Sequence, residues 1–547
     1  MGRHRPPTIL RAMNPLHDMP LATDRAALLQ RLRDPTNYDI AVVGGGATGL
    51  GVALDAAARG LRVVLIDSHD FAKGTSSRST KLVHGGVRYL AQGNIALVRE
   101  ALHERSLLLE NAPYLARPLP FVVPAYHWWE APFYGSGLLM YDVLAGSSGL
   151  GRTQLMGRAR TLECLPGLRQ DGLKGGVKYW DGQFNDARLA IALARTAAAH
   201  GALLVNYCAA TELCYHGERI SGLVCRDTLG GQEFQIQSRC VVNATGVWVD
   251  ALRQKDSLAA PGGRGEATQA MVAPSQGVHM VVERDFLGSD AALMVPKTSD
   301  GRVLFAVPWL GKLILGTTDT PRHDLDREPM AFDEEIDFIL GESARYLRRP
   351  PGRQDVKSIW VGLRPLVKPP QEDGRDTKTL SREHTIVVSR SGLVTVTGGK
   401  WTTYRAMAED VLEQCAQSQL LPATRRGATQ SLRLIGAGGP ARTIQPIHQA
   451  PGWHSYGAEA GYVRSLPGAE DELCPGLTAA MVRFAVRHEY AMRVEDVLAR
   501  RSRLLFLDAA AAVNLAARVG DILQQEGLGA PGVAEFEALA TNYLLRS

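Results

Sequence analysis

The chain has 547 residues, of which 45% are hydrophobic and 21% charged, so it is an ordinary globular protein too long for one hydrophobic core. Its formal net charge of +5 is small for this length and does not indicate a nucleic-acid-binding protein. The seven cysteines are scattered and form no Cys-x-x-Cys motif, which favours reduced thiols in a cytosolic protein without a metal site. We expect two or three domains.

The first segment, from Met1 to about Asn37, is rich in arginine and proline and lacks the apolar core of a signal peptide. We expect a flexible arm there, with Met13 as an alternative start. No apolar segment reaches the roughly 18–20 residues that a membrane-spanning helix needs. The sequence therefore predicts a soluble or peripherally bound protein.

The most informative stretch runs from Tyr38 to Asp67. Ile40–Val43 has the length and β-branched content of a buried parallel strand, and Gly44-x-Gly46-x-x-Gly49 follows it directly. A segment with helical spacing then leads to a second strand at Val63–Ile66. The glycines allow a tight turn, a close approach to a pyrophosphate and close packing of helix on strand, and Asp67 is placed to accept hydrogen bonds from ribose hydroxyls. The stretch predicts a dinucleotide-binding βαβ unit.

A run dense in hydroxyl groups, glycines and basic residues follows, from Gly74 to Leu90. An exposed polar loop is one interpretation. The pair Gly85-Gly86 beside an apolar continuation instead favours a second close approach of the backbone to the cofactor. A helix is predicted next, over Val98–Leu109.

From Pro113 the composition shifts to proline and aromatic residues, which marks a departure from the nucleotide domain. Within this part, Phe133–Ala145 is short, apolar and flanked by Trp128 and Trp129. A core helix is the favoured interpretation, and a segment that dips into a membrane interface is the alternative.

The middle of the chain contains further parts of the nucleotide domain and then an antiparallel sheet. A helix is expected to start after Asn185 or Asp186, and the strand Val241–Gly246 ends in small residues suited to lie against a ligand. Between Met271 and Thr320 the pattern alternates, which predicts a platform of antiparallel strands at 279–282, 303–307 and 313–315.

Leu393–Arg405 has the same order of elements as the start of the dinucleotide-binding unit, namely a strand, a double glycine and the beginning of a helix. The N-terminus of that helix is expected to point at a ligand. Gly436–Ala441 is also rich in glycine, but no long helix follows it, and we interpret it as a linker. Ala479–Asp508 and Ala509–Gln525 have helical periodicity and predict a separate helical domain. Its basic stripe is interpreted as a solvated face and consists of Arg487, Arg493, Arg500, Arg501 and Arg503.

Taken in order, these motifs resemble the FAD-dependent glycerol-3-phosphate dehydrogenases. The resemblance is carried by Thr75–Ser77, Lys81–Tyr89, Asn243–Gly246, Gly277–His279, Gly316–Asp319, Gly362–Leu366, Gly398–Arg405, Arg487–Tyr490 and Asp496–Arg503. It implies an α/β fold of the D-amino-acid oxidase type, in which a Rossmann-like FAD-binding domain is interleaved with an antiparallel-sheet substrate domain and followed by an all-helical domain. The expected boundaries are 1–37 for the arm, 38–112, 181–270 and 356–420 for the FAD-binding domain, 113–180 and 271–355 for the substrate domain, 421–450 for the linker, and 451–547 for the helical domain.

The resemblance also implies a reaction, the oxidation of glycerol 3-phosphate to dihydroxyacetone phosphate by FAD with transfer of the electrons to a membrane quinone. The chain contains no D-x-D-x-D-G calcium loop, so the resemblance is to the bacterial type. We expect a homodimer that is cytoplasmic, bound peripherally to the inner face of the cell membrane, and without a nucleic-acid partner.

The residues that match these motifs form the expected site. The cofactor-binding residues are Gly44, Gly45, Gly46, Thr48, Gly49, Asp67, Thr75, Ser76, Ser77, Lys81, His84, Gly85, Ala244, Gly246, Gly398, Gly399 and Thr403. The substrate would be bound by Arg88, Tyr89 and Lys400, with Arg364 as a further cation. His279 is the expected general base, although Arg364 could instead lower the pKa of the alcohol and leave the proton to water.

Two other functions are compatible with the motifs. An oxidase of the same fold that acts on an amino or hydroxy acid needs one cation for a carboxylate, whereas Arg88, Arg364 and Lys400 together favour a phosphate. A non-catalytic FAD-binding protein could associate with membrane or nucleic acid through its arginine-rich helices, and substrate would then not bleach the flavin.

Overall fold

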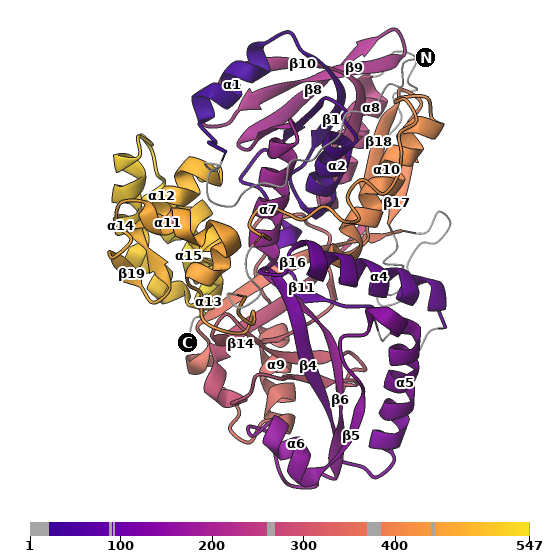
Figure 1. The fold of residues 1–547 in the computed structure, drawn as a ribbon, viewed down its shortest axis with the longest axis vertical. Coiled ribbons are helices and arrows are strands. Elements are labelled where there is room, and N and C mark those ends of the chain that lie inside the picture. Colours follow the sequence, from indigo (N-terminus) through magenta and orange to yellow (C-terminus); the bar gives the residue numbers. More distant parts are fainter. Residues whose placement is uncertain are drawn as a thin grey trace, which may run out of the picture.

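The computed structural model of the chain describes residues 21–86, 90, 93–259, 268–368, 384–438 and 444–545. The described residues form two large sheets, which lie one above the other in Figure 1, and a helical C-terminal domain beside them. Arg88 and Tyr89 lie outside the described residues.

The first sheet contains the predicted dinucleotide-binding unit. Its parallel strands follow the order β18 (Leu393–Thr397), β10 (Glu233–Asn243), β1 (Asn37–Val43), β2 (Val63–Ile66) and β7 (Leu203–Val205), with β17 (Thr385–Val388) antiparallel at one edge. Two further strands, β8 (Cys208–His216) and β9 (Arg219–Asp227), extend antiparallel from β10. Helices α2 (Ala47–Ala58), α7 (Asp186–Ala199) and α10 (Tyr404–Gln417) share one apolar core with this sheet, which contributes buried β-branched residues to it, among them Ile40, Val242 and Val394.

The second sheet is mostly antiparallel, as the alternating strands predict. Its order is β15 (Thr320–Pro321), β11 (Val272–Glu283), β14 (Lys312–Gly316), β13 (Leu304–Trp309), β12 (Ala292–Val295), β4 (Ala116–Ala125), β6 (Gly175–Phe184) and β3 (Leu82–Val83), with β5 (Gln154–Gly157) on β6. Helices α4 (Ile95–Asn111), α5 (Glu130–Ala145), α6 (Arg158–Cys164) and α9 (Asp333–Tyr346) lie around it.

Two strands of this sheet lie in segments that the sequence assigns to the FAD-binding domain, β3 in 38–112 and β16 (Ser358–Val367) in 356–420. Strand β16 pairs antiparallel with β11 from Ser358 to Val367. Residues 358–367 therefore belong to the antiparallel sheet. The strand pattern alone could not decide this, because a buried strand has the same composition in either sheet.

The predicted flexible arm also contains ordered structure. Helix α1 (Arg25–Arg33) begins with Asp24, whose carboxylate accepts a hydrogen bond from the Ala27 N–H. Arg25 forms an ion pair with Asp227 at 2.7 Å, and Leu32 is buried. Residues 25–33 are thus part of the nucleotide-binding half and not a free arm.

The C-terminal domain consists mainly of short helices, seen at the left of Figure 1. They are α11 (Ala460–Ser465), α12 (Ala479–His488), α13 (Leu504–Leu507), α14 (Ala509–Gln525) and α15 (Val533–Ala540), with a hairpin of β19 (Glu472–Cys474) and β20 (Leu477–Thr478). The predicted helix Ala479–Asp508 is not continuous, since α12 ends at His488 and a π-helical turn, Asp496–Arg501, precedes α13. Between them Arg503 adopts a left-handed φ of 68°.

The basic stripe predicted on this domain is not a solvated face. Arg487 is exposed, but Arg500, Arg501 and Arg503 are 2%, 4% and 0% exposed and form ion pairs with carboxylates elsewhere in the fold. Charge periodicity could not reveal this, because Asp70 and Asp186, which pair with these arginines, lie hundreds of residues away in the sequence.

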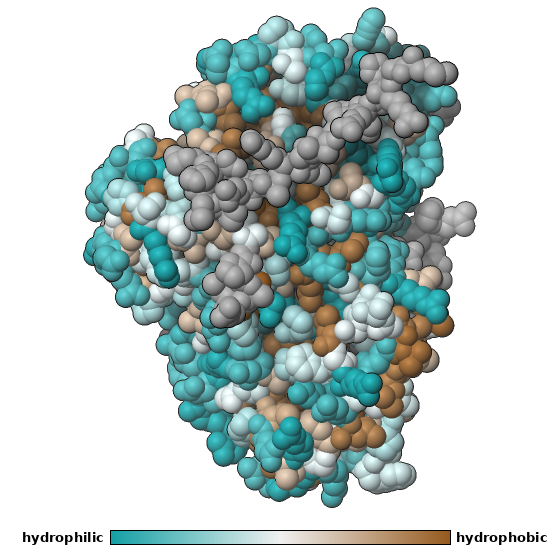
Figure 2. Space-filling view, in the orientation of Figure 1, coloured by the Kyte–Doolittle hydropathy of each residue, from teal (hydrophilic) through white to brown (hydrophobic). Residues whose placement is uncertain are grey.

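Helix α5 is not the core helix favoured from its composition. It buries Gly135, Leu138, Tyr141 and Ala145 and leaves other apolar side chains in solvent. The exposed set, which we call the α5 patch, consists of Trp128, Trp129, Phe133, Leu139, Met140, Val143 and, from β5, Leu155. Apolar residues are visible over α5 at the right edge of Figure 2. Among the described residues, no helix has the length and apolar character required to cross a membrane.

The contact between α2 and β1 gives a test of the packing. A Cβ on Gly49 would lie 1.9 Å from the Gly44 carbonyl oxygen, so Gly49→Ala must push the helix away from the strand. We expect this substitution to destabilise the protein by about 1–3 kcal/mol in urea unfolding. Gly137→Ala is the control, because a Cβ there meets nothing within 4 Å in α5 and should be neutral or stabilising. Equal stability of both variants would contradict the close packing.

Candidate active site

A cavity of about 550 Å³ lies where the two sheets meet. Its walls come from the carboxyl ends of β1, β2, β10 and β18 on one side and from β11 and β16 on the other. The carboxyl edge of a parallel sheet is where ligands bind in folds of this type. The position of the cavity therefore agrees with the predicted cofactor site.

The glycine turn after β1 forms one end of the cavity. Gly44 has a φ of 109°, a conformation that favours glycine, and both Gly44 and Gly46 line the cavity. The Ala47 N–H at the start of α2 donates to Ser76 Oγ at 2.9 Å, and the Gly45 N–H donates to Asp67 Oδ2 at 2.6 Å. Gly46, Ala47 and Thr48 line the cavity, so the positive end of α2 faces it, which suits a pyrophosphate.

Asp67 lines the same end, directly after β2. Burial raises its pKa to about 6, and the nearby Asp70 adds to the rise, while N–H groups of His69 and Gly45 oppose it. Beside it, His69 has a pKa lowered to about 4 by burial and by Arg327 and Lys73. Asp67 thus titrates close to neutral pH, whereas His69 stays uncharged there.

The sequence analysis missed several residues at this end, among them Arg327 and Trp248. Arg327 lies 5.1 Å from the centre of the Trp248 ring, and its Nη1 is 3.2 Å from His69 Nδ1. Trp248 in turn donates to the Leu325 carbonyl at 2.9 Å. Trp248 follows the predicted segment Val241–Gly246, but Arg327 lies in a loop of ordinary polar composition that carries no motif.

The double glycine after β18 forms the other end. Gly398 and Gly399 have φ values of 82° and 72°, and Lys400 and Thr402 line the cavity with them. Helix α10 begins only at Tyr404, after a 3-10 turn at Trp401–Thr403. The backbone therefore turns back beside the cavity as the sequence predicts, with Thr402 in place of Thr403 at its wall.

His279 and Arg364 reach the cavity from neighbouring strands. On β11 and β16, His279 pairs with Trp360 and Ser275 with Arg364. Gly277 lies between them in β11, and a Cβ there would be 2.2 Å from Arg364 Nη2. The absence of a side chain at Gly277 is what allows the guanidinium to lie across β11 into the cavity.

The surroundings of His279 keep its imidazole neutral. Its ring stacks on Trp360 at 4.2 Å and 18°, and Nε2 lies 3.0 Å from Thr80 Oγ1. Burial, and after it the charges of Lys81 and Arg364, hold the pKa of His279 well below its ordinary value. A neutral imidazole has a free lone pair that can accept a proton, but its lowered pKa makes His279 a weaker base than an exposed histidine.

The guanidinium of Arg364 is held by neighbours on the second sheet. It forms an ion pair with Asp319 at 3.3 Å and donates to Thr317 Oγ1 at 3.0 Å and to the Thr318 carbonyl at 2.9 Å. Nη1 also donates to the Gln276 carbonyl at 3.2 Å, so both Nη atoms are held by the protein and the oriented guanidinium offers the cavity a fixed positive charge.

The structure brings most of the predicted site residues into one cavity. Those that line it are Gly44, Gly46, Thr48, Asp67, Thr75, Ser76, His84, Ala244, Gly246, His279, Arg364, Gly398, Gly399 and Lys400. Those among the described residues that do not line it are Gly45, Gly49, Ser77, Lys81, Gly85 and Thr403. Their roles in binding and catalysis stay predictions. Gly85, for example, packs where its Cβ would be 2.5 Å from the Tyr141 hydroxyl.

Lys81 differs most from its predicted role. It is fully buried, with Nζ 2.7 Å from Asp186, 2.8 Å from the Ser77 carbonyl and 4.3 Å from the Trp360 ring centre. Burial lowers its pKa to about 7 despite the attraction of Asp186. Lys81 therefore supports the loop behind the cavity wall and does not line the cavity.

The residues present fit FAD. The glycine cradle with Asp67 suits the ADP half, and the wall from Gly398 to Thr402 suits the flavin half, in one continuous cavity. Within the described residues, no group of His, Cys, Asp and Glu side chains is arranged to hold a metal ion.

Comparisons with known proteins agree with this site. A family described as FAD dependent oxidoreductase matches residues 39–405, and the C-terminal domain of alpha-glycerophosphate oxidase matches residues 428–528. The mitochondrial glycerol-3-phosphate dehydrogenase of Homo sapiens is 40% identical over 92% of this chain and 72% of its own length, and that of Bos taurus is 39% identical over the same shares. The glycerol-3-phosphate dehydrogenase from Bacillus halodurans, solved with FAD, matches with a TM-score of 0.73 and 28% identity over 95% of this chain and 97% of its own.

The raised pKa of Asp67 predicts how FAD binding depends on pH. Only the ionised carboxylate can accept both ribose hydroxyls, and below about pH 6 the group carries a proton. We expect the Kd for FAD to be constant above pH 7 and to rise by up to about tenfold per unit below pH 6, measured by flavin fluorescence. In Asp67→Asn the affinity should be weaker and independent of pH. His69→Gln should keep the wild-type pH profile, and a flat wild-type profile would contradict the role of Asp67.

Proposed function

Because the chain belongs to the FAD-dependent glycerol-3-phosphate dehydrogenases, we propose that it oxidises sn-glycerol 3-phosphate to dihydroxyacetone phosphate and passes the electrons to a membrane quinone. The observation that carries the proposal is that a neutral buried histidine and an oriented arginine share one cavity with the FAD cradle. Bound FAD supplies the acceptor for the two electrons.

The substrate is a small dianion with a secondary alcohol. Arg364 would attract its phosphate through the charge of a guanidinium that Asp319 and the Thr318 carbonyl already orient. Lys400, which lines the cavity beside the double glycine, adds a positive charge. Cations that are oriented before binding lose little freedom when the phosphate arrives, which favours affinity.

His279 would take the proton from the alcohol. The imidazole is neutral at pH 7, and its stacking on Trp360 and contact with Thr80 fix the direction of the ring. Protonation of His279 would add a positive charge to those of Lys81 and Arg364, so the proton should leave readily for water after the reaction.

The structure favours this function over the two alternatives. An amino-acid or hydroxy-acid oxidase needs one cation for its carboxylate, whereas Arg364 and Lys400 both line this cavity. A nucleic-acid partner would need the arginines of the C-terminal domain in solvent, and Arg500, Arg501 and Arg503 are buried in ion pairs.

Anaerobic titration of the purified flavoprotein tests the reaction. Glycerol 3-phosphate should bleach the flavin absorbance, and a soluble quinone analogue added afterwards should restore it. In Arg364→Ala, FAD content should be unchanged and kcat/KM for glycerol 3-phosphate should fall at least about 100-fold, since a charged hydrogen-bonding partner of the phosphate is lost.

Arg160→Ala is a matched control, because the Arg160 side chain is 68% exposed on α6 and should not affect the reaction. Bleaching by amino acids but not by glycerol 3-phosphate would overturn the proposed substrate. Unchanged kcat/KM in Arg364→Ala would remove this residue from the substrate site.

The α5 patch supports peripheral attachment to a membrane. Trp128, Val143 and Phe133 are 83%, 79% and 64% exposed, and such a group of aromatic and aliphatic side chains is unusual on a soluble surface. Tryptophan is enriched at membrane–water interfaces, where one part of its ring is apolar and the other is wet. We propose that this face rests on the inner face of the cell membrane, where the quinone is reduced. The homodimer stays a prediction.

Vesicle flotation tests the attachment. Phe133→Asp combined with Val143→Asp should abolish binding to phospholipid vesicles and slow the reduction of vesicle-embedded quinone, while activity with a soluble dye acceptor stays unchanged. Leu258→Asp is the control, because Leu258 is 60% exposed on α8 (Val249–Ala259), outside the α5 patch. Normal vesicle binding by the double variant would show that another surface makes the contact.

A further inference from the structure

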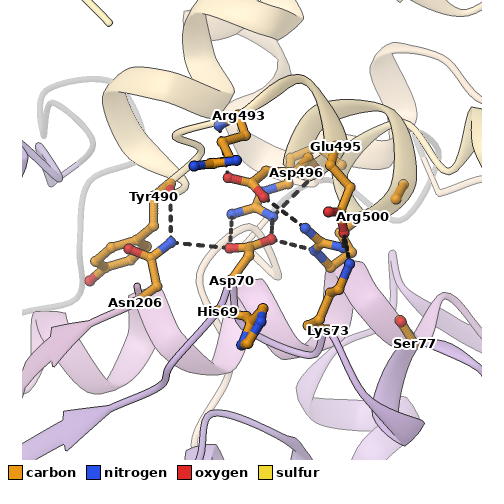
Figure 3. A network of polar contacts seen from close by, with 12 residues as sticks. His69, Asp70, Lys73, Ser77, Asn206, Tyr490, Arg493, Glu495, Asp496 and Arg500 are labelled. Carbon is orange, nitrogen blue, oxygen red and sulfur yellow. Dashed lines mark hydrogen bonds and ion pairs between the residues drawn. The ribbon is translucent and has the colours of Figure 1, made fainter. Parts of the chain in front are cut away.

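Asp70 connects the cofactor cavity to the C-terminal domain. It lies three residues after Asp67, in a loop whose Asp67, His69, Lys73 and Ser76 line the cavity, yet Asp70 itself is fully buried. Figure 3 shows that its carboxylate is surrounded by polar side chains from distant parts of the sequence. Asp70 therefore fixes the loop 67–77 on the side that faces away from the cavity.

The main partners of Asp70 are arginines of the C-terminal domain. Arg500 Nε lies 2.5 Å from Asp70 Oδ2, Arg501 Nη1 forms an ion pair with the same oxygen, and Arg501 Nη2 donates to Oδ1 at 3.0 Å. Asn206 adds a hydrogen bond at 3.2 Å and also donates to the Tyr490 carbonyl. Burial alone would raise the pKa of Asp70, but Arg501 and Arg500 hold it below its ordinary value. The carboxylate is therefore ionised and fixed in place.

The same network reaches a residue of the cavity wall. Arg500 also pairs with Asp496 at 2.7 Å and with Glu495 at 2.6 Å, and Glu495 pairs with Lys73 at 2.5 Å. Lys73 lines the cavity and makes a second ion pair, at 2.8 Å, with Glu328. Glu328 in turn pairs with Arg78 at 2.6 Å. Four cations thus face four acids, so the buried charges are not left unpaired; they are Lys73, Arg78, Arg500 and Arg501, with Asp70, Glu328, Glu495 and Asp496.

A third arginine holds the far end of the loop. Arg503 Nη2 donates to the Ser77 carbonyl at 2.7 Å, and the left-handed backbone of Arg503 directs its side chain back along the π-helical turn, where Nη1 donates to the Ala499 carbonyl at 2.6 Å. Ser77 follows Ser76, whose hydroxyl accepts from the first N–H of α2. Residues 500–503 therefore hold the loop at Asp70 and again at Ser77.

We infer that Arg500, Arg501 and Arg503 are positioning residues for FAD, which hold the loop 67–77 in the shape that binds the ADP half of the cofactor. The inference rests on FAD as the cofactor and is independent of the substrate and the electron acceptor. It makes the C-terminal domain part of the cofactor site, although none of the residues described in that domain lines the cavity. By linkage, FAD binding must then stabilise the segment 496–503 as well as the loop.

Hydrogen exchange on the full wild-type chain tests the linkage directly. Addition of FAD to the FAD-free protein should slow amide exchange in peptides that cover 67–77 and, to a similar extent, in peptides that cover 496–503. Peptides from α14 are the internal control and should change little. Slower exchange in 67–77 with no change in 496–503 would overturn the inference.

Substitutions can distinguish an effect on the position of the loop 67–77 from an effect on the stability of the whole protein. Arg501→Gln should raise the Kd for FAD at least tenfold, and Asp70→Asn should do the same. Arg195→Gln is the matched control, since Arg195 is equally buried and joins α7 to Glu459 through two hydrogen bonds of 2.6 Å without touching the loop. It should lower the melting temperature as Arg501→Gln does but change the Kd less than twofold.

Equal FAD affinities for Arg501→Gln and Arg195→Gln, measured at a temperature where circular dichroism shows both folded, would overturn the inference. If Arg501→Gln does not fold, the inference is tested by the FAD affinity of Asp70→Asn and by the hydrogen exchange of the wild type. Bleaching of the wild-type flavin by glycerol 3-phosphate is measured separately, so a failure of the proposed reaction cannot be mistaken for a failure of this inference.

Discussion

A buried charged side chain must meet an opposite charge, and this constraint holds the parts of this molecule together. Asp70 meets Arg500 and Arg501, Lys81 meets Asp186, and Arg405 meets Glu104, with each side chain almost fully buried. Loss of one partner of such a pair typically costs about 3–5 kcal/mol, because the other charge remains without compensation. The pairs join residues that lie far apart in the sequence, so they specify one arrangement of the two sheets and the C-terminal domain.

Burial also sets the chemistry of the cavity. The same loss of water that raises the pKa of Asp67 to about 6 lowers that of His279, because burial disfavours whichever form is charged. Lys81, on the far side of the wall from the cavity, adds to the effect on His279 although it does not line the cavity. Lys81, which the sequence predicts to contact the cofactor, therefore affects the site through its charge, which lowers the pKa of His279.

Much of the fold could be predicted from local sequence patterns. The strand, glycine turn and helix from Asn37 to Ala58 follow from spacing alone, since glycine conformation and helix packing are local constraints, and the double glycine at 398–399 follows in the same way. His279 and Arg364 were found through short motifs. The exposure of α5 was not found, because its apolar composition is the same whether the helix is buried or not.

The sequence by itself determined the dinucleotide-binding unit, the antiparallel platform and the glycine turns of the cavity wall, because each depends on the order of neighbouring residues. Only the tertiary structure decided which charges are buried. Arg500, Arg501 and Arg503 have the spacing of a surface stripe, and their acidic partners Asp70 and Asp186 lie more than 300 residues before them. A long-range ion pair leaves no periodic trace in either segment, so its existence becomes visible only when the chain has brought the two segments together.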